Sequence, residues 1–331
     1  YIISIRDALN SENTNQPKET LIFCDYIVCC NGTYASPNIP VLKDRNLYTG
    51  QEMHTSDYTD MTSFTAKLEN KRVVVVGSGI SGRDMVNHIV QGFKGHQPIK
   101  VKSLTLVMSS DADTETFRKA QVNYKKHAEV LKTIIGPVTA FTGPNTLKTK
   151  YGTVDADMII WATGYKQSLP FLEDSDNILK VEHEESRGHY VYPMFMKTFS
   201  INQPTFAKLS DTFIARAELI LTLERQMSVI AAVFSGRTQL PTKQKMLSSL
   251  EKSVNRLKNA GYTLKSYCRE IPGVNDQEML LKKWYKYSGH AERNEELDKF
   301  TNDADKAEVE FVDNGYFFAA PQLSFRNLPY N

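Results

Sequence analysis

The feature that most constrains the fold is a glycine loop that directly follows a run of four valines. Residues 71–76, KRVVVV, predict a buried strand, and residues 77–82 have the pattern Gly-x-Gly-x-x-Gly. Apolar residues then recur at helical spacing: Ile80, Met85, Val86, Ile89 and Val90. In this order of strand, loop and helix, the glycine pattern predicts a dinucleotide-binding unit. We therefore expect an α/β fold with a Rossmann-like domain.

Each glycine of the loop has a separate expected task. Gly77 permits a tight turn, Gly79 lets a pyrophosphate approach the backbone, and Gly82 lets the helix pack closely on the strand. The helix N-terminus would offer free N–H groups to the phosphates. The candidate cofactor-binding residues are the whole loop: Gly77, Ser78, Gly79, Ile80, Ser81 and Gly82. The alternative is a purely structural glycine turn, which the preceding valine run disfavours.

The choice between NADP and NAD depends on the residues after the second strand, predicted at 104–108. An acidic residue there would bond the ribose of NAD, and an arginine would accept the extra phosphate of NADP. The sequence offers the following residues: Ser109, Ser110 and Asp111, then Arg118 and Lys119. Ser109 is the candidate contact, and Arg83 is a second one, with a solvated surface charge as its alternative. The nucleotide preference stays open at this point.

A further apolar strand, predicted within residues 155–165, ends in Thr163 and Gly164. Open α/β sheets bind ligands at the carboxyl ends of their strands, so we expect Thr163 and Gly164 near a cofactor. Before the glycine loop, Pro37 and Pro40 predict an extended linker, because proline fixes its own φ and restricts the preceding residue.

The outer parts of the chain predict strands and two helices. Residues 1–30 suggest a hairpin whose turn is the polar stretch 11–20 and whose second strand is 21–30. Strands are also expected at 190–195 and 204–209. Residues 217–234 predict a helix buried nearly all round, and residues 246–257 an amphipathic helix that ends at Gly261.

Composition excludes several classes of partner. The 331 residues include 40 basic and 38 acidic side chains, with a net charge of +2 and no long block of either sign, so we expect neither nucleic acid nor an anionic membrane as partner. The four cysteines lack metal-ligand spacing, which predicts no metal site and buried, reduced thiols. No apolar stretch reaches the roughly 20 residues of a transmembrane helix, and we expect a cytoplasmic protein. Because Tyr1 starts in mid-strand, we expect a piece of a longer protein.

Four ordered motifs carry a family resemblance. Residues 48–58, YTGQEMHTSDY, resemble the fingerprint Phe-x-Gly-x-x-x-His-x-x-x-aromatic of flavin-containing monooxygenases, with Tyr48 in the leading position. Residues 30–34 with Pro37 and Pro40 resemble the family's first linker, and residues 162–165, ATGY, match its second. The segment with Glu224, Gln226, Ser235-Gly236 and Leu240-Pro241 resembles the part that returns to the flavin domain.

The resemblance implies a flavoprotein with two dinucleotide-binding domains, in which an NADP domain is inserted into an FAD domain. The implied division is as follows: residues 1–60 as the first FAD segment and linker, 61–160 as the NADP domain, 161–240 as the second FAD segment and 241–331 as a helical C-terminal extension. The implied enzyme is of the N,N-dimethylaniline monooxygenase type: NADPH reduces FAD, O2 forms a C4a-(hydro)peroxyflavin, and one oxygen atom passes to a soft nitrogen or sulfur nucleophile. The resemblance is also compatible with a homodimer.

The resemblance also implies site residues outside the glycine loop. Asn31, Gly32 and Gln226 are expected to contact a cofactor, and His54 is expected mainly to fix a linker by hydrogen bonds. The catalytic residues remain unknown, because the cofactors carry the chemistry. One departure is Lys208, which occupies a position where relatives usually have glycine close to the flavin.

A second departure is that no glycine loop for FAD precedes Tyr1. Two alternatives therefore stay open. One is a related flavoenzyme of the Baeyer–Villiger, N-hydroxylating or disulfide-reductase type; the missing Cys-x-x-Cys argues against the last, and Tyr58-Thr59 against the first. The other is a non-catalytic NADP-binding paralogue.

Overall fold

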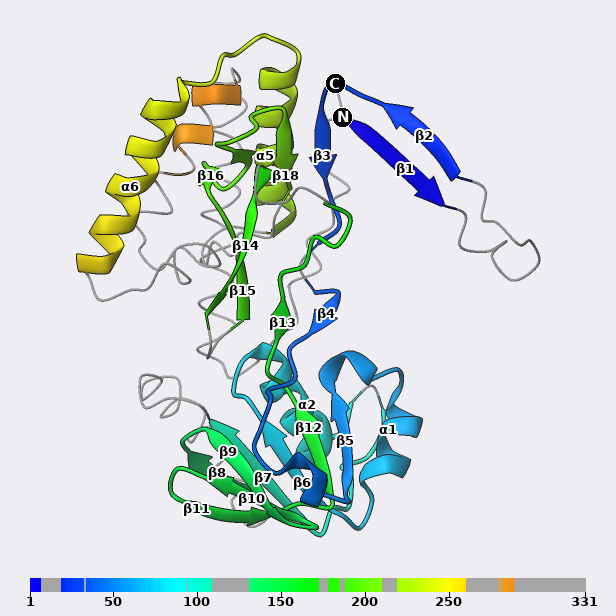
Figure 1. Cartoon of the computed structure of the whole chain (residues 1–331). Helices are drawn as coiled ribbons and strands as arrows, with labels where there is room; N and C mark the ends of the chain where they lie inside the picture. Colours follow the sequence, from blue (N-terminus) through cyan, green and yellow to red (C-terminus); the bar gives the residue numbers. More distant parts are fainter. Residues whose placement is uncertain are drawn as a thin grey trace. The chain divides into compact units, whose positions relative to one another are not determined.

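The computed structural model describes residues 1–6, 19–32, 34–93, 95–108, 131–172, 178–184, 188–209, 219–259, 280, 282–284 and 286–288. The chain divides into two compact units. Unit 1 comprises residues 1–33 and 167–331, and unit 2 comprises residues 34–166. The fold is mixed α/β, as the sequence predicts (Figure 1). The four-part domain division inferred from the resemblance remains a prediction.

Unit 2 is built on a five-stranded parallel sheet. Its strands lie in the following order: β5 (Gln51–His54), β12 (Met158–Trp161), β6 (Arg72–Val76), β7 (Ser103–Met108) and β8 (Leu131–Ile135). All four neighbouring pairs are parallel. The chain passes from β6 to β7 on one side and places β12 on the other, so the strand order changes direction beside β6. In open α/β sheets this is where ligands bind.

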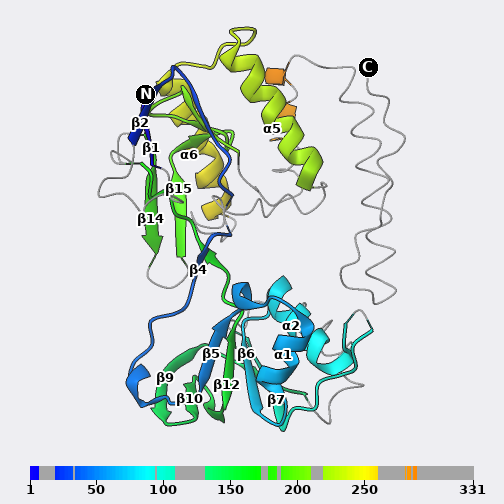
Figure 2. The same ribbon diagram turned by 90° about the vertical axis from the view of Figure 1, so that its right-hand side faces the viewer.

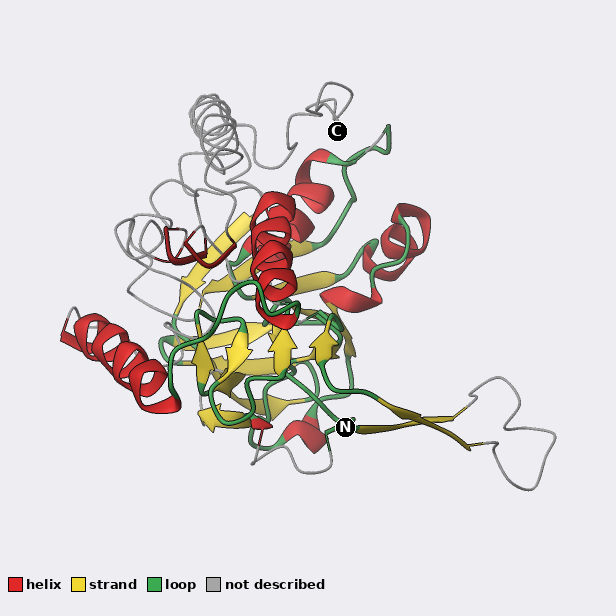
Figure 3. Cartoon of the chain, turned by 90° about the horizontal axis from the view of Figure 1, so that it is seen from above, coloured by secondary structure: helices red, strands yellow, loops and turns green. Residues whose placement is uncertain are grey.

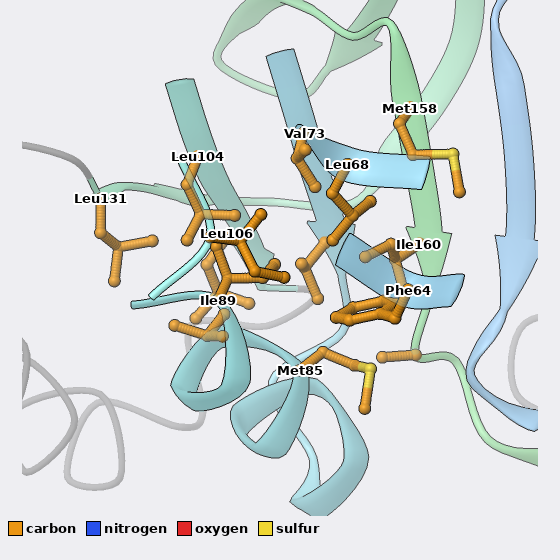
Figure 4. Close-up of a cluster of buried hydrophobic side chains, with 14 of the residues drawn as sticks. Phe64, Leu68, Val73, Met85, Ile89, Leu104, Leu106, Leu131, Met158 and Ile160 are labelled. Carbon is orange, nitrogen blue, oxygen red and sulfur yellow. The ribbon is translucent and has the colours of Figure 1, made fainter. Parts of the chain in front are cut away.

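Two helices cover one face of this sheet, α1 (Met61–Leu68) and α2 (Ile80–Gln91). Val73 and Val75 of β6 point to this face because successive strand residues alternate between faces. Figure 4 shows the side chains of both helices and four strands meeting in one core: Phe64, Leu68, Val73, Met85, Ile89, Leu104, Leu106, Leu131, Met158 and Ile160. The buried apolar area fixes α2, and with it the glycine loop, on the end of β6.

A small antiparallel sheet covers the opposite face. It consists of β9 (Val138–Gly143), β10 (Thr146–Thr149) and β11 (Gly152–Asp155). Trp161 of the parallel sheet is completely buried in a core with Phe141 and Leu147 of the small sheet. Figure 2 shows this sheet and the helices α1 and α2 on opposite sides of the parallel sheet.

Unit 1 contains a four-stranded sheet with two helices. The strand order is β16 (Met194–Phe195), β17 (Phe199–Ser200), β18 (Phe206–Lys208) and β3 (Ile27–Cys29), and only the pair β18–β3 is parallel. Helices α5 (Leu219–Phe234) and α6 (Lys243–Asn259) share a core with it. Trp284 is buried there and donates from Nε1 to the Met196 carbonyl at 3.1 Å. A separate antiparallel pair is formed by β14 (Lys180–Glu184) and β15 (Gly188–Tyr192).

The N-terminal hairpin differs from its prediction. Strand β1 (Ile2–Arg6) pairs with β2 (Glu19–Phe23), and the two form a long ribbon (Figure 3). The second strand predicted at 21–30 is wrong as one element, because the chain bends at Asp25 and continues as β3 in another sheet. Phe23 is 73% exposed, so the apolar residues of this ribbon do not form a core by themselves.

Three other expectations need correction. Helix α5 is not buried all round, since Met227 is 56% exposed. Cys30 is exposed, whereas Cys29 is buried and Cys24 intermediate; all three thiols are free. The strand predicted at 190–195 is interrupted at Pro193, which has no N–H for a ladder. Cys268 and Gly261 lie outside the described residues.

Two expected absences can be stated only for the part of the chain that the structure describes. None of its helices combines the length and the apolar character that a membrane crossing requires. The same residues contain no group of three or more side chains that could hold a metal ion.

Candidate functional site

The two outer glycines of the loop are sterically required. Gly77 has φ +113, and a Cβ there would lie 2.3 Å from the Ala162 carbonyl oxygen. A Cβ on Gly82 would lie 1.9 Å from the Gly77 oxygen and 3.3 Å from the Ala162 Cβ. Real Cβ atoms do not approach backbone this closely. The turn expected at Gly77 and the close helix packing expected at Gly82 are therefore present.

The central glycine has the opposite environment. A Cβ on Gly79 would meet nothing within 4 Å, and its φ of −64 is accessible to any residue. Gly79 is also the N-cap of α2, and no side chain caps this end. Ser81 is exposed and Ile80 is 44% exposed. Open space next to the uncapped N–H groups of a helix N-terminus fits a pyrophosphate.

Thr163 and Gly164 follow β12 at the same carboxyl edge of the sheet as the glycine loop. Thr163 Oγ1 donates to the Asn38 carbonyl, and Asn38 Nδ2 returns a 3.4 Å bond to the Thr163 carbonyl. Gly164 has φ +75, and its carbonyl accepts the Asn38 N–H at 2.9 Å. The structure thus brings these two predicted residues beside Ala162, which contacts both outer glycines.

His54 of the fingerprint binds the second linker directly. Its Nε2 lies 2.9 Å from the Gly164 oxygen, while its Nδ1 accepts the Ser56 N–H at 3.1 Å. Since Nδ1 accepts, the proton is on Nε2 and donates to Gly164. Burial lowers the pKa of His54, which favours this neutral form. The linker-fixing role expected for His54 is therefore confirmed in geometry.

The two linkers form one ribbon in unit 2. Strand β4 (Ser36–Pro37) pairs antiparallel with β13 (Tyr165–Lys166). The Tyr165 ring makes edge contacts with His54 at 5.0 Å and with Tyr34 at 5.3 Å between centroids. The fingerprint histidine therefore fastens the second linker, which in turn pairs with the first, at the point where the chain enters and leaves unit 2.

The remaining predicted residues belong to other parts of the chain. Asn31, Gly32 and Gln226 lie in unit 1, and Ser109 lies outside the described residues. Asn31 accepts from the Cys29 thiol at 2.9 Å and donates to the Ser168 carbonyl at 3.4 Å. Gly32 has φ +70, and a Cβ there would meet nothing within 4 Å. Gln226 is completely buried on α5.

Lys208, which occupies a position where relatives usually have glycine, is only 1% exposed. It lies at the end of β18 directly opposite Cys29 of β3. Burial raises the pKa of the Cys29 thiol, and the charge of Lys208 acts in the opposite direction. The lysine thus belongs to the interior of unit 1.

Sequence reasoning missed two groups that shape the site. Asn38 joins the linkers, and Glu52 accepts a 2.7 Å bond from the buried indole N–H of Trp161. Both act across more than 100 residues, so no local pattern could reveal them. The sequence contained one indication for Glu52: it is an acidic residue in a strand, and the neighbouring strand contains a buried tryptophan.

Comparison with known families agrees with this site. The sequence model of the pyridine nucleotide-disulphide oxidoreductase family matches residues 2–200, and that of the flavin-binding monooxygenase-like family matches residues 133–273. The first of these models covers more than half of the chain, which therefore belongs to the pyridine nucleotide-disulphide oxidoreductase family. FAD and NADP are the cofactors of this family.

The individual relatives of this chain are distant. Senecionine N-oxygenase of Tyria jacobaeae is 28% identical over 265 residues, which are 78% of this chain and 51% of the relative. Flavin-containing monooxygenase FMO GS-OX3 of Arabidopsis thaliana is 27% identical over 73% of this chain and 47% of its own length. The chain spans about half the length of these curated relatives.

The fold is shared with a solved S-allyl-L-cysteine S-oxygenase from Allium sativum. The TM-score is 0.62 at 21% identity, over 91% of this chain and 62% of that one. The agreement supports the α/β arrangement described above.

Proposed function

We propose that the protein containing this chain is an NADPH- and FAD-dependent monooxygenase that transfers one oxygen atom of O2 to a soft nitrogen or sulfur nucleophile. The observation that carries the proposal is the contrast within the glycine loop, where Gly77 and Gly82 contact backbone and Gly79 faces open space. This contrast suits a loop shaped to receive a pyrophosphate. Two relatives named as an N-oxygenase and an S-oxygenase support the substrate class.

In this proposal unit 2 holds NADP. The amides of residues 77–82 and the N-terminus of α2 would bind the pyrophosphate, and Thr163 and Gly164 would border the nucleotide on the neighbouring strand. His54 would keep the linkers fixed while the nucleotide is bound. Ser109 and Arg83 stay candidates for the NADP phosphate.

Unit 1 would contribute Asn31, Gly32 and Gln226 to the flavin. Bound FAD supplies the redox chemistry with O2, and the protein side chains orient the cofactors and exclude water. The N,N-dimethylaniline type, the homodimer and the cytoplasmic location remain predictions from the sequence.

The experiment is a product analysis with the full-length protein, NADPH and O2. A thioether and a tertiary amine should give the sulfoxide and the N-oxide. Each turnover should consume one NADPH and one H⁺, insert one oxygen atom of O2 into the substrate and reduce the other oxygen atom to water. A lactone formed from a cyclic ketone would instead indicate a Baeyer–Villiger enzyme.

A second candidate is a non-catalytic NADP-binding protein, and the specific observation that favours it is the buried Lys208. A full-length protein that binds NADPH, remains colourless and oxidises no NADPH with any of the three substrates would establish this second function and contradict the first.

A further inference from the structure

One tryptophan links the fingerprint to the end of strand β12. Trp161 is completely buried and is the last residue of β12, where it pairs with His54 of β5 and Val76 of β6. Its indole N–H is removed from water and therefore requires an acceptor. Glu52 supplies that acceptor: Trp161 Nε1 donates to its Oε2 at 2.7 Å.

Glu52 is itself held in place. Arg45 Nη2 donates to the same Oε2 at 2.6 Å, and the Glu52 side chain is 20% exposed. A carboxylate that accepts two N–H groups on one oxygen has little freedom to rotate, and hydrogen bonds to a charged acceptor are stronger than neutral ones. The position of the indole is thus set by the fingerprint strand as well as by apolar packing.

The residue after Trp161 touches both outer glycines of the loop. The Ala162 carbonyl oxygen lies 2.3 Å from the position of a Cβ on Gly77, and the Ala162 Cβ lies 3.3 Å from the position of a Cβ on Gly82. Ala162 is also bound to β6 by its N–H, which donates to the Val76 carbonyl at 2.8 Å. A shift of Ala162 by a few tenths of an ångström would therefore move the turn at Gly77.

We infer that Glu52 is a positioning residue for the NADP-binding loop and acts through Trp161 and Ala162. The inference rests on the proposed binding of NADP at the glycine loop. Without the carboxylate, the indole N–H has lost its acceptor and the end of β12 can relax toward a new partner, so the loop is no longer held in one conformation. Glu52 itself does not contact the nucleotide.

The test measures the dissociation constant for NADP⁺ and the thermal midpoint of the full-length protein and of five variants. Glu52→Ala should weaken NADP⁺ binding about tenfold, because an unpaired buried donor has a large cost. Glu52→Gln keeps an oxygen acceptor and should stay within about twofold of the original protein. Glu69→Ala removes an exposed glutamate of the same unit and should change neither quantity.

The fourth variant, Trp161→Phe, removes the N–H that Glu52 serves. In this background Glu52→Ala should no longer weaken NADP⁺ binding. Equal affinity of Glu52→Ala and the original protein, even with a lower thermal midpoint, would reduce Glu52 to a structural residue and overturn the inference. So would an unchanged tenfold loss in the Trp161→Phe background. A failure of the original protein to bind NADP⁺ would instead overturn the proposed function, and this inference with it.

Discussion

The strands of the five-stranded sheet have different environments at their two ends, which form the carboxyl edge and the amino edge of the sheet. At the carboxyl edge, β6 ends in the glycine loop, β5 ends in the neutral His54 and β12 ends in the Thr163-Gly164 linker. The bonds that hold the linkers here join neutral groups, such as His54 Nε2 and the Gly164 carbonyl. This edge also has the open space beside Gly79.

The amino edge is closed by charged groups. Arg72 donates to Asp157 from its backbone N, from Nε at 3.0 Å and from Nη2 at 2.6 Å, and to Asp155 from Nη1 at 2.9 Å. These bonds lower the pKa of Asp157 to about 2, chiefly through its side-chain bond with Arg72. The first residue of β6 is thereby tied to the residue that precedes β12.

The two ends of the strands thus differ in what they offer a ligand. The amino edge contributes ion pairs that fix the strands, and the carboxyl edge leaves N–H groups available. Changes at the carboxyl edge should therefore alter NADP affinity together with stability, and changes at the amino edge should alter stability alone.

The largest effect is expected for Gly82→Ala. A methyl group would lie 1.9 Å from the Gly77 oxygen, so the N-terminus of α2 must move away from the turn at Gly77. We expect a loss of about 3 kcal/mol in the free energy of unfolding from this overpacking, and no measurable NADP⁺ binding. Urea denaturation and calorimetric titration check both. A variant as stable as the original protein would show that the loop is not packed as described.

A smaller effect is expected for His54→Phe. The ring volume is retained, but the Ser56 N–H loses its acceptor, while Gly164 keeps its bond from Asn38. Stability should fall by about 2 kcal/mol. NADP⁺ affinity should fall as well, because the second linker is released at the carboxyl edge. An unchanged NADP⁺ affinity of this variant would contradict the assignment of His54 to the edge of the sheet that binds the nucleotide.

His54 also predicts a pH dependence. Its folded pKa lies below the ordinary 6.5, so the unfolded chain takes up the proton first as the pH falls. The stability that neutral His54 contributes is complete above pH 6.5 and is lost as the pH falls through the folded pKa. Urea midpoints between pH 8 and 5 should show this loss in the original protein, and His54→Phe should show a smaller one, because His88, whose pKa burial also lowers, remains.

The smallest effect is expected for Asp157→Asn at the amino edge. Because the folded pKa is about 2 against an ordinary 3.8, the carboxylate stabilises the fold above pH 3.8, and this stability is lost as the pH falls to 2. The side chain is 30% exposed, so we expect only about 1 kcal/mol at neutral pH. The difference between the two proteins should vanish near pH 2. NADP⁺ affinity should not change, and a clear loss of affinity would contradict the separation of the two edges.

Local patterns were sufficient for the core of the candidate site. The glycine loop, the helix after it and the strand before it follow from residues 71–90, because the spacing of glycines and apolar side chains is itself the physical requirement. His54 was recognised from a fingerprint only 11 residues long. Its role as a linker bond agrees with the structure.

Contacts between distant segments could not be predicted in this way. The bond from Trp161 to Glu52 joins two strands, and the bond from Asn38 to Thr163 joins two linkers, that are far apart in the sequence and that only the fold brings together. Similarly, the break between β2 and β3 depends on β3 pairing with β18, about 180 residues away in sequence. Periodicity reports burial of a segment and does not identify its partner.

The most direct test of the central claim is the substitution Gly79→Ala. A methyl group at this position meets no protein atom within 4 Å and adopts an ordinary φ, so the stability should stay within about 0.5 kcal/mol. The same methyl would occupy the space assigned to the pyrophosphate. Calorimetric titration of the full-length variant with NADP⁺ should show at least about a hundredfold weaker binding, on the order of 3 kcal/mol. Binding as tight as that of the original protein would show that the nucleotide does not lie on this loop.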